Sequence, residues 1–375
     1  MTSRTTRRTF LKHAGSISAL ALAGCATTNG YTRRYDVFPS YVDDKTGAKV
    51  YNLTPAASQD VLIYQTHPMW TPRMAYFVYM TGGRIHAIDM ATGKSRPLAD
   101  TTTDCSMQWR SNDLYYFSGN DLFRLDVPSA YQGTGKAEKI ATFPAEYAGR
   151  CGVLSVDAAG DVVYTGAVIE ADKRYGIVGY SRDGWKLLTS VDFRIGHIQA
   201  NPFISKSVMF CWETGGDAPQ RTWFIDASTD KARPAYPEQN EEWVTHEAWW
   251  GPDRMIFTIW PYDDAHKQLP HGVAWSTVGS GQRNIIAQYP AWHAHGSPDG
   301  RWALGDDFDR NIWLIDMKTL ERRLLTQGHL GPNCKTHPHS SFTPDSRAIV
   351  LNSSHSGNDD ILLVPIPKWE SLPKA

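Results

Sequence analysis

The chain has 375 residues, of which 41% are hydrophobic and 12% aromatic, and its formal net charge is −1 at pH 7. Nucleic-acid binding needs a basic face, and this composition offers none. The length suffices for two or three ordinary domains or for one large repeat.

The first 24 residues are predicted to be an export signal. The stretch TTRRTFLKHAG (5–15) carries paired arginines before a modest apolar run, the pattern of twin-arginine export. The run ends in LAGC (22–25), a lipoprotein cleavage pattern, so Cys25 is the predicted lipidation site. Residues 25–45 would then be the tether of a periplasmic or cell-envelope protein that meets the membrane only through its lipid.

The residue after Cys25 is not the aspartate that typically retains a lipoprotein at the inner membrane, so the outer membrane is favoured. A transmembrane helix is the alternative, but the apolar run is short and contains Ser16 and Ser18. The signal holds four basic residues and no acid, so the rest of the chain carries a net charge of about −5. The other four cysteines are widely and irregularly spaced, unlike a disulfide framework.

A strand–turn–strand unit recurs along the remaining chain. Between the units lie further short strands, often preceded by a turn such as SPDG at 297–300. Four strands for every 40–50 residues or so are typical of a β-propeller, and seven units predict seven blades. The recurring units are 85–98, 122–131, 177–188, 223–234, 272–286, 312–325 and 361–367.

The predicted domain is therefore an all-β, seven-bladed β-propeller over residues 46–370. AKVYNLT (48–54) precedes the first full unit and ILLVPIP (361–367) ends the last, so pairing of these N- and C-terminal strands would close the ring. Two stacked β-domains would show similar strands, but not so regular a turn.

Three polar residues stand out in the middle of the repeat. IGHIQANPF (195–203) holds His197, RTWFIDA (221–227) begins with Arg221, and VTHEAWW (244–250) holds His246. A histidine can move a proton near neutral pH, and an arginine can grip a carboxylate with two hydrogen bonds. Each residue taken alone could equally be structural.

A metal-ligand set follows towards the C-terminus. AWHAHG (291–296) supplies His293 and His295, one of which would be a ligand. NCKTHPHSSF (333–342) supplies Cys334, His337 and His339, and residues two apart on a strand face the same side. Imidazole and thiolate together are typical ligands of zinc. The alternative is that these polar residues are packed at the start of a strand and bind no metal.

These motifs resemble the oligogalacturonate lyases, polysaccharide lyases built as seven-bladed propellers. The similarity covers almost all of the chain after the signal. Besides IGHIQANPF, RTWFIDA and VTHEAWW it includes YVDDKTGAKVYNLTP (41–55), the His293 segment through SPDGRWALGDD, and KTHPHSSFTPD (335–345), in family order.

The resemblance implies a role for each matching residue. His293, His337 and His339 would bind a divalent metal, manganese in the family. His246 would be the general base, Arg221 would support the substrate, and His197 would line the same site. The family's fourth ligand is a glutamine where this chain has Cys334, and a thiolate favours zinc or another thiophilic metal.

The resemblance also implies the reaction, β-elimination at a uronate in an acidic oligosaccharide, most simply oligogalacturonate. The C5 hydrogen becomes acidic once the neighbouring carboxylate is neutralised, a base removes it, and the oxygen at C4 leaves. Two alternatives remain open: a lyase for another uronate glycan such as ulvan, and a non-catalytic propeller scaffold. A scaffold would leave His246, Arg221 and the metal ligands scattered.

Overall fold

The computed structural model describes residues 35–56, 58–100, 104–171, 173–214, 218–226, 231–239, 242–261, 268–331 and 336–375. The predicted signal, the predicted lipidation site Cys25 and the predicted ligand Cys334 lie outside these ranges.

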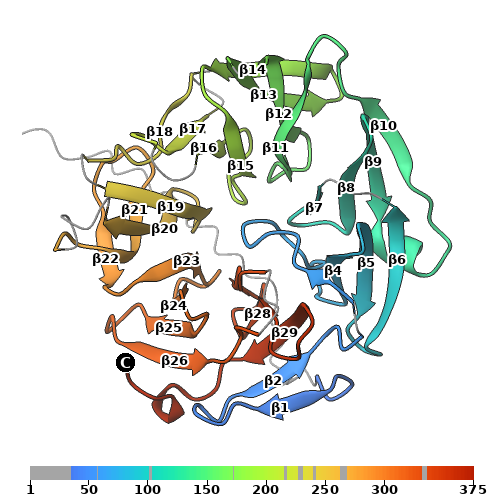
Figure 1. Ribbon diagram of the computed structural model, residues 1–375. Coiled ribbons are helices and arrows are strands. Elements are labelled where there is room, and N and C mark those ends of the chain that lie inside the picture. The colour runs from blue at the N-terminus through green and yellow to red at the C-terminus, as the bar shows by residue number, and fades with distance from the viewer. Residues whose placement is uncertain are drawn as a thin grey trace, which may run out of the picture. The chain divides into compact units, whose positions relative to one another are not determined.

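The described strands form seven antiparallel sheets arranged as blades around a common centre (Figure 1). This confirms the predicted seven-bladed β-propeller. Blades 1 to 3 consist of β3 (Asp60–Val61), β4 (Tyr76–Thr81), β5 (Arg84–Asp89) and β6 (Lys94–Asp100); β7 (Cys105–Met107), β8 (Asp113–Ser118), β9 (Asp121–Asp126) and β10 (Glu138–Thr142); and β11 (Gly149–Val156), β12 (Val163–Glu170), β13 (Arg174–Ser181) and β14 (Gly184–Val191).

Blades 4 to 6 repeat this four-stranded plan, and the first strand of each blade lies innermost. They consist of β15 (Ile195–Ala200), β16 (Val208–Trp212), β17 (Thr222–Ile225) and β18 (Arg233–Pro234); β19 (Glu242–Trp249), β20 (Arg254–Pro261), β21 (Gly272–Thr277) and β22 (Asn284–Ala287); and β23 (Ala291–Gly296), β24 (Trp302–Asp307), β25 (Ile312–Asp316) and β26 (Arg322–Thr326).

Blade 7 closes the ring with strands from both ends of the fold. It orders β27 (Ser341–Phe342), β28 (Ala348–Ser353), β29 (Asp360–Pro365), β2 (Lys49–Asn52) and β1 (Ser40–Val42) from the inside outwards. Tyr51 pairs with Leu363 across the junction between β2 and β29. The predicted closure is confirmed, and β1 extends the blade into the range that the sequence assigns to a tether. Because the ring is closed, each described blade packs between two neighbouring blades.

Apolar side chains fill every contact between neighbouring blades. Seven clusters of buried residues lie one at each blade–blade interface. At the closing interface, Leu304 and Leu314 of blade 6 pack with Val50 and Val364 of blade 7. Each fully buried side chain of this kind contributes about 1.5–3 kcal/mol. Packing therefore fixes the inner strands, which carry the predicted site residues.

One predicted strand segment is partly helical. The unit at 122–131 was expected to form strands, but its second half is the helix α1 (Val127–Tyr131). Asp126 caps this helix by accepting a hydrogen bond from the Ser129 backbone N–H, and Pro128 lies in its first turn. Both residues favour a helix start over a strand. The remaining described helix is a 3-10 turn, Trp369–Ser371.

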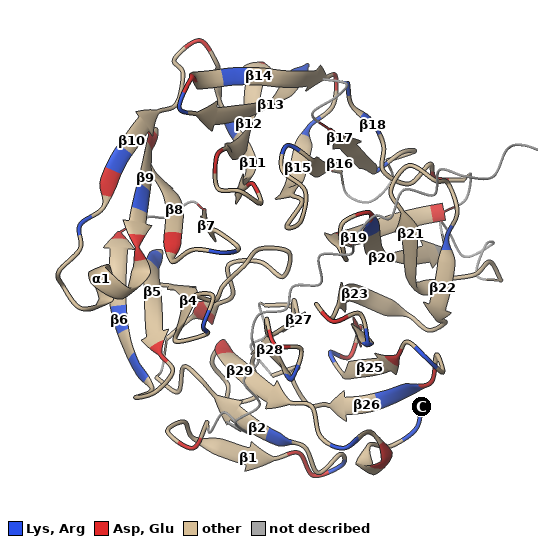
Figure 2. Ribbon diagram, turned by 180° about the vertical axis from the view of Figure 1, so that it is seen from behind, with Lys and Arg blue, Asp and Glu red and all other residues tan. Residues whose placement is uncertain are grey.

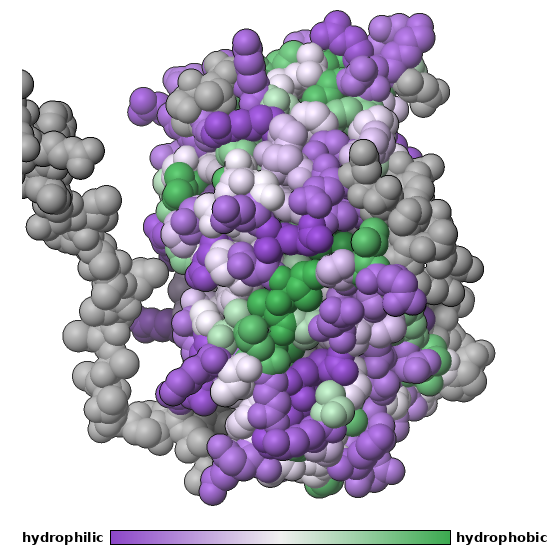
Figure 3. All heavy atoms as spheres, turned by 90° about the vertical axis from the view of Figure 1, so that its left-hand side faces the viewer, coloured by the Kyte–Doolittle hydropathy of each residue, from purple (hydrophilic) through white to green (hydrophobic). Residues whose placement is uncertain are grey.

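The surface is polar and mixed in charge. Acidic and basic residues are interspersed around the blades (Figure 2). The side that carries blades 5 and 6 is mostly hydrophilic with a short band of hydrophobic side chains (Figure 3). In the described part of the chain, no helix has the length and apolarity that a membrane crossing requires.

Candidate active site

Four inner segments bring the predicted site residues towards the centre of the ring. His197 lies on β15, His246 on β19 and His293 on β23. His337 and His339 lie in the irregular segment just before β27. The site is therefore assembled from blades 4, 5, 6 and 7.

Each of the three inner strands is bulged where its histidine stands. The pairing register shifts between Gly196 and Gln199 in β15 and between Thr245 and Ala248 in β19, and β23 has a similar shift between Ala291 and Ala294. His197 and His246 have positive φ angles of 45° and 52°. Bulges re-aim side chains, and such strained backbone persists only where the surrounding packing imposes it.

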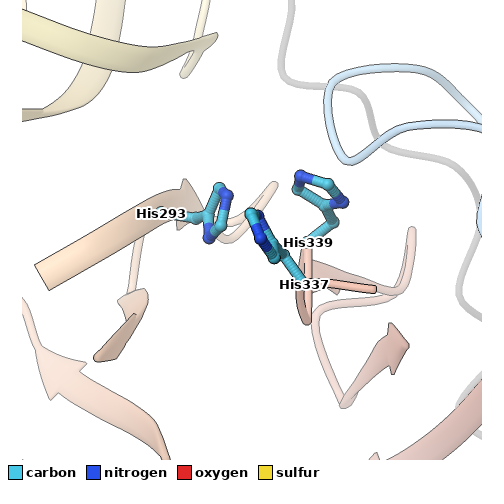
Figure 4. Close-up of side chains that lie close together, drawn as sticks. All are labelled: His293, His337 and His339. Atoms are coloured by element: carbon cyan, nitrogen blue, oxygen red, sulfur yellow. The ribbon is translucent and has the colours of Figure 1, made fainter. Parts of the chain in front are cut away.

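Three histidines form a cluster suited to a metal ion. One ring nitrogen each of His293, His337 and His339 lies within 4.8 Å of the others. Figure 4 shows His293 approaching from its strand while His337 and His339 approach from the opposite segment. We call these three residues the histidine cluster. Burial lowers the pKa of all three, which favours the neutral imidazole that binds metals.

His293 shows most directly that the cluster fits a metal. Its Nδ1 lies 2.8 Å from Oδ2 of the buried Asp306, which orients the ring. Its Nε2 is buried and has no hydrogen-bond partner among the described residues. A buried imidazole held by a carboxylate, with its other nitrogen left free, is the usual arrangement of a metal-binding histidine.

The segment that carries the other two histidines is tied to the body of the fold. Asn352 donates from Nδ2 to the carbonyl of His337 at 3.0 Å and from its backbone N–H to Pro338 at 2.8 Å. The buried Arg310 donates to the carbonyl of Thr336 at 2.6 Å. These bonds fix the segment even though it is not a strand.

His295 does not join the cluster, although it lies two residues from His293. The backbone N–H of Phe342 approaches its Nδ1 at 3.5 Å, and its ring lies beside the Phe342 ring. The bulge in β23 separates the two side chains that simple alternation would place together. Of the two histidines that the sequence left open, the structure therefore places His293 in the cluster.

His246 lies against the histidine cluster and beside Trp260 of its own blade. Its ring centroid is 4.1 Å from that of His293 and 6.0 Å from that of Trp260. Its Nδ1 is buried and lacks a hydrogen-bond partner within the described structure. Burial, reinforced by the nearby His293 and His197, lowers its pKa well below the usual value. A neutral ring with a free nitrogen can accept a proton.

A charged network includes Glu247, the residue that follows His246. Nε of Arg221 donates to Oε2 of Glu247 at 3.3 Å, and Nδ1 of His197 donates to Oε1 of Glu247 at 3.2 Å. Glu247 is 0% exposed. Although burial alone would raise its pKa, Arg221 and His197 lower it to about 2. We call Arg221, Glu247 and His197 the Arg–Glu–His network.

Several of these partners were not predicted from the sequence. Glu247 follows His246 in VTHEAWW, but the motif assigns it no role, and nothing in the sequence distinguishes Asp306 from other aspartates at strand ends. Tyr64 and Glu213 also approach His197, at 3.5 Å from the Tyr64 hydroxyl and 3.7 Å from Glu213 Oε2 to its Nε2. Tyr64 is 133 residues away in the chain, a contact that no local pattern encodes.

Aromatic side chains form a wall beside the cluster. The Trp292 ring lies 3.9 Å from that of His337 and stacks on Phe308 at 5.0 Å. Trp260 lies 5.3 Å from Phe308. Phe308 is 48% exposed, so part of its ring faces solvent beside the histidine cluster. A separate groove of about 780 Å³ lies between blades 3 and 4, lined by residues such as Arg174 and Trp223, and holds none of the predicted site residues.

Sequence comparison points to the oligogalacturonate lyases. No protein-family profile matches the chain. The oligogalacturonide lyase of Pectobacterium atrosepticum is 25% identical over 198 residues, which are 46% of this chain and 50% of that protein. The chain spans about half the length of the curated relatives it matches.

Solved structures extend the likeness of the fold to almost the whole propeller. The oligogalacturonate lyase of Vibrio parahaemolyticus superimposes with a TM-score of 0.77 at 16% identity, covering 88% of this chain and 97% of that one. An oligogalacturonate lyase in complex with manganese superimposes with a TM-score of 0.77 at 18% identity, covering 88% and 96%. The chain therefore resembles the oligogalacturonate lyases in both sequence and fold, as its motifs predict.

Proposed function

We propose that this protein is a lyase that cleaves uronate-containing oligosaccharides by β-elimination, with oligogalacturonate as its substrate. The observation that carries the proposal is His246, whose buried Nδ1 has no hydrogen-bond partner among the described residues and whose ring lies 4.1 Å from that of His293 in the histidine cluster. The electrostatic influence of Arg221, Glu247 and His197 also reaches His246. A scaffold has no need to gather these groups in one place, so their grouping supports the lyase.

The residues divide the chemistry between them. His293, His337 and His339 would hold a divalent metal. When bound, the metal supplies positive charge that offsets the uronate carboxylate and makes the C5 hydrogen more acidic. Arg221 contributes a fixed positive charge beside the same site, held in place by Glu247. His246 accepts the C5 proton, the double bond forms between C4 and C5, and the C4–oxygen bond breaks.

A substrate panel tests the proposal. The protein, loaded with manganese or zinc, is incubated with oligogalacturonate, ulvan and glucuronate oligosaccharides, and the ultraviolet band of the unsaturated uronate is followed. Growth of the band on oligogalacturonate is expected. Growth only on another glycan would reassign the substrate, and no growth on any member would favour the scaffold.

We further propose that the metal is zinc or another thiophilic ion, because Cys334 replaces the glutamine of the family. His293→Ala is expected to abolish stable metal binding, measured by elemental mass spectrometry after dialysis. His295→Ala, on the same strand but outside the cluster, is the matched control and should keep its metal. Cys334→Gln should shift the preference towards manganese in a competition experiment, and an unchanged preference would argue against a Cys334 ligand.

The aromatic wall predicts a sugar-stacking surface. Phe308→Ala is expected to raise KM for oligogalacturonate about fivefold, equivalent to about 1 kcal/mol of lost stacking, with kcat nearly unchanged. Phe203→Ala, which removes another partly exposed phenylalanine from a loop of blade 4, is the control. Equal KM values for the two variants would contradict the stacking role.

The N-terminal motif predicts lipid anchoring at Cys25 after twin-arginine export. Cys25→Ala is expected to abolish labelling by a fatty-acid analogue and to move the protein from the membrane fraction to the supernatant. Continued membrane association of the variant would contradict the anchor. Lysine replacement of Arg7 and Arg8 should separately block export.

A further inference from the structure

The loop that follows β3 enters the centre of the ring (Figure 1). We call residues 62–69 the inner loop. It is bonded to three blades besides its own: the Leu62 backbone N–H donates to Asn352 of blade 7 at 2.9 Å, Gln65 Nε2 donates to the Ala294 carbonyl of blade 6 at 3.5 Å, and His67 Nε2 donates to the Leu154 carbonyl of blade 3 at 2.9 Å. These hydrogen bonds fix the position of the inner loop.

Tyr64 of the inner loop stands between the two groups of site residues. Its ring centroid is 5.0 Å from that of His339 in the histidine cluster and 5.3 Å from that of His197 in the Arg–Glu–His network. Its hydroxyl lies 3.5 Å from Nε2 of His197. The side chain is half-buried, and Figure 4 shows the inner loop, in pale blue, passing beside His339.

The proposed reaction requires a second proton transfer, to which no residue has yet been assigned. When the C4–oxygen bond breaks, the departing sugar oxygen must receive a proton. In a galacturonate ring the C5 hydrogen and the C4 oxygen leave from opposite faces, so the base that removes the hydrogen cannot also reach the oxygen. The donor must therefore come from a different side of the site than His246.

We propose that the hydroxyl of Tyr64 donates this proton, an inference that rests on the proposed lyase function. Tyr64 comes from blade 1 and His246 from blade 5, so the two approach the site from different parts of the ring. The C5–H bond breaks towards His246, the C4–C5 double bond forms, the C4–O bond breaks, and the phenolic proton passes to the leaving oxygen. A phenol carries its proton at neutral pH and so can serve as the donor.

His197 positions this hydroxyl. Nδ1 of His197 donates to the buried Glu247, which directs its Nε2 at the phenolic oxygen of Tyr64, 3.5 Å away. This contact fixes the position of the hydroxyl, whose single proton goes to the leaving sugar oxygen. After each turnover the phenolate takes a proton from water, and His246 releases its own proton to water.

Tyr64→Phe removes only the hydroxyl and tests the proposal in the full-length, metal-loaded protein. On trigalacturonate, kcat is expected to fall about 100-fold, while KM and metal content stay within about threefold of wild type. On a 4-fluoro galacturonide, whose leaving fluoride needs no proton, the variant should match wild type. Tyr180→Phe, which removes from blade 3 a hydroxyl that donates to the Ile140 carbonyl of blade 2, is the matched control.

The outcomes separate the proposal from the lyase assignment on which it rests. A kcat within about threefold of wild type would overturn the role of Tyr64, as would an equal loss on both substrates or a loss that follows metal content. An inactive wild type across the substrate panel would instead overturn the proposed function. A His197→Gln variant that lowers kcat on trigalacturonate but not on the fluoride substrate would support His197 as the positioning residue.

Discussion

Replacing His246 by alanine is expected to lower kcat for uronate elimination by about 10²- to 10⁴-fold, the usual contribution of a general base. His246 offers a buried nitrogen that has no partner among the described residues, and its ring centroid lies 4.1 Å from that of His293. The fall is measured from the initial growth of the unsaturated-uronate absorbance at saturating substrate. KM should change little, because the side chain acts on the C5 hydrogen in the transition state rather than on the bound sugar.

Two controls identify what His246 does. Metal content of the His246→Ala protein should equal that of wild type, since loss of metal would make His246 a ligand rather than the base. The His295→Ala protein, altered on the neighbouring inner strand, should retain most of its activity. Activity of the His246 variant within about tenfold of wild type would contradict the assignment.

The fold was predictable because a propeller repeats its local signals. Each blade presents short alternating strands and a turn, so seven weak patterns support one another along the chain. The terminal stretches 48–54 and 361–367 predicted closure because each would otherwise lack a partner, and Tyr51 and Leu363 do pair. The helix α1 was not predicted because the aspartate that caps it, Asp126, and the proline in its first turn, Pro128, are equally common in the turns between strands.

The grouping of His293, His337 and His339 could be predicted from the sequence, but strand alternation is not its cause. Alternation along a strand was expected to aim His337 and His339 together, yet both precede β27, and His339 has a φ of 43°. They come close to His293 because Asn352 and Arg310 hold their segment. Alternation also fails for His293 and His295, which the bulge in β23 directs to different neighbours.

The supporting residues could not be predicted because their partners are distant in sequence. His246 and Glu247 are consecutive, but the bulge in β19 allows His246 to meet His293 of blade 6 while Glu247 meets Arg221 of blade 4. Tyr64 meets His197 only because the inner loop crosses into the ring. Contacts between blades depend on the closed ring, which local patterns do not specify.

Glu247→Gln is expected to destabilise the fold by about 3–5 kcal/mol, the usual cost of leaving one partner of a buried ion pair without its counter-charge. Glu247 is 0% exposed and bridges Arg221 and His197, and Arg221 is itself buried. The glutamine keeps the shape of the side chain, so loss of charge and not of volume is tested. The free energy is measured by urea unfolding at neutral pH, with the metal removed from both proteins.

The pH dependence and a matched carboxylate make this prediction specific. The pKa of Glu247 is about 2 in the folded protein and about 4.3 in the unfolded chain. Its contribution to the free energy of unfolding is therefore fully present above about pH 4.3 and is lost as the pH falls towards about 2. The gap in stability between wild type and Glu247→Gln should therefore be constant from neutral pH to about pH 5 and should narrow below about pH 4.

Glu213→Gln alters the partly exposed carboxylate on the other side of His197 and should cost about 1 kcal/mol or less. Similar losses for the two variants would mean that Glu247 is not the anchor of Arg221 and His197.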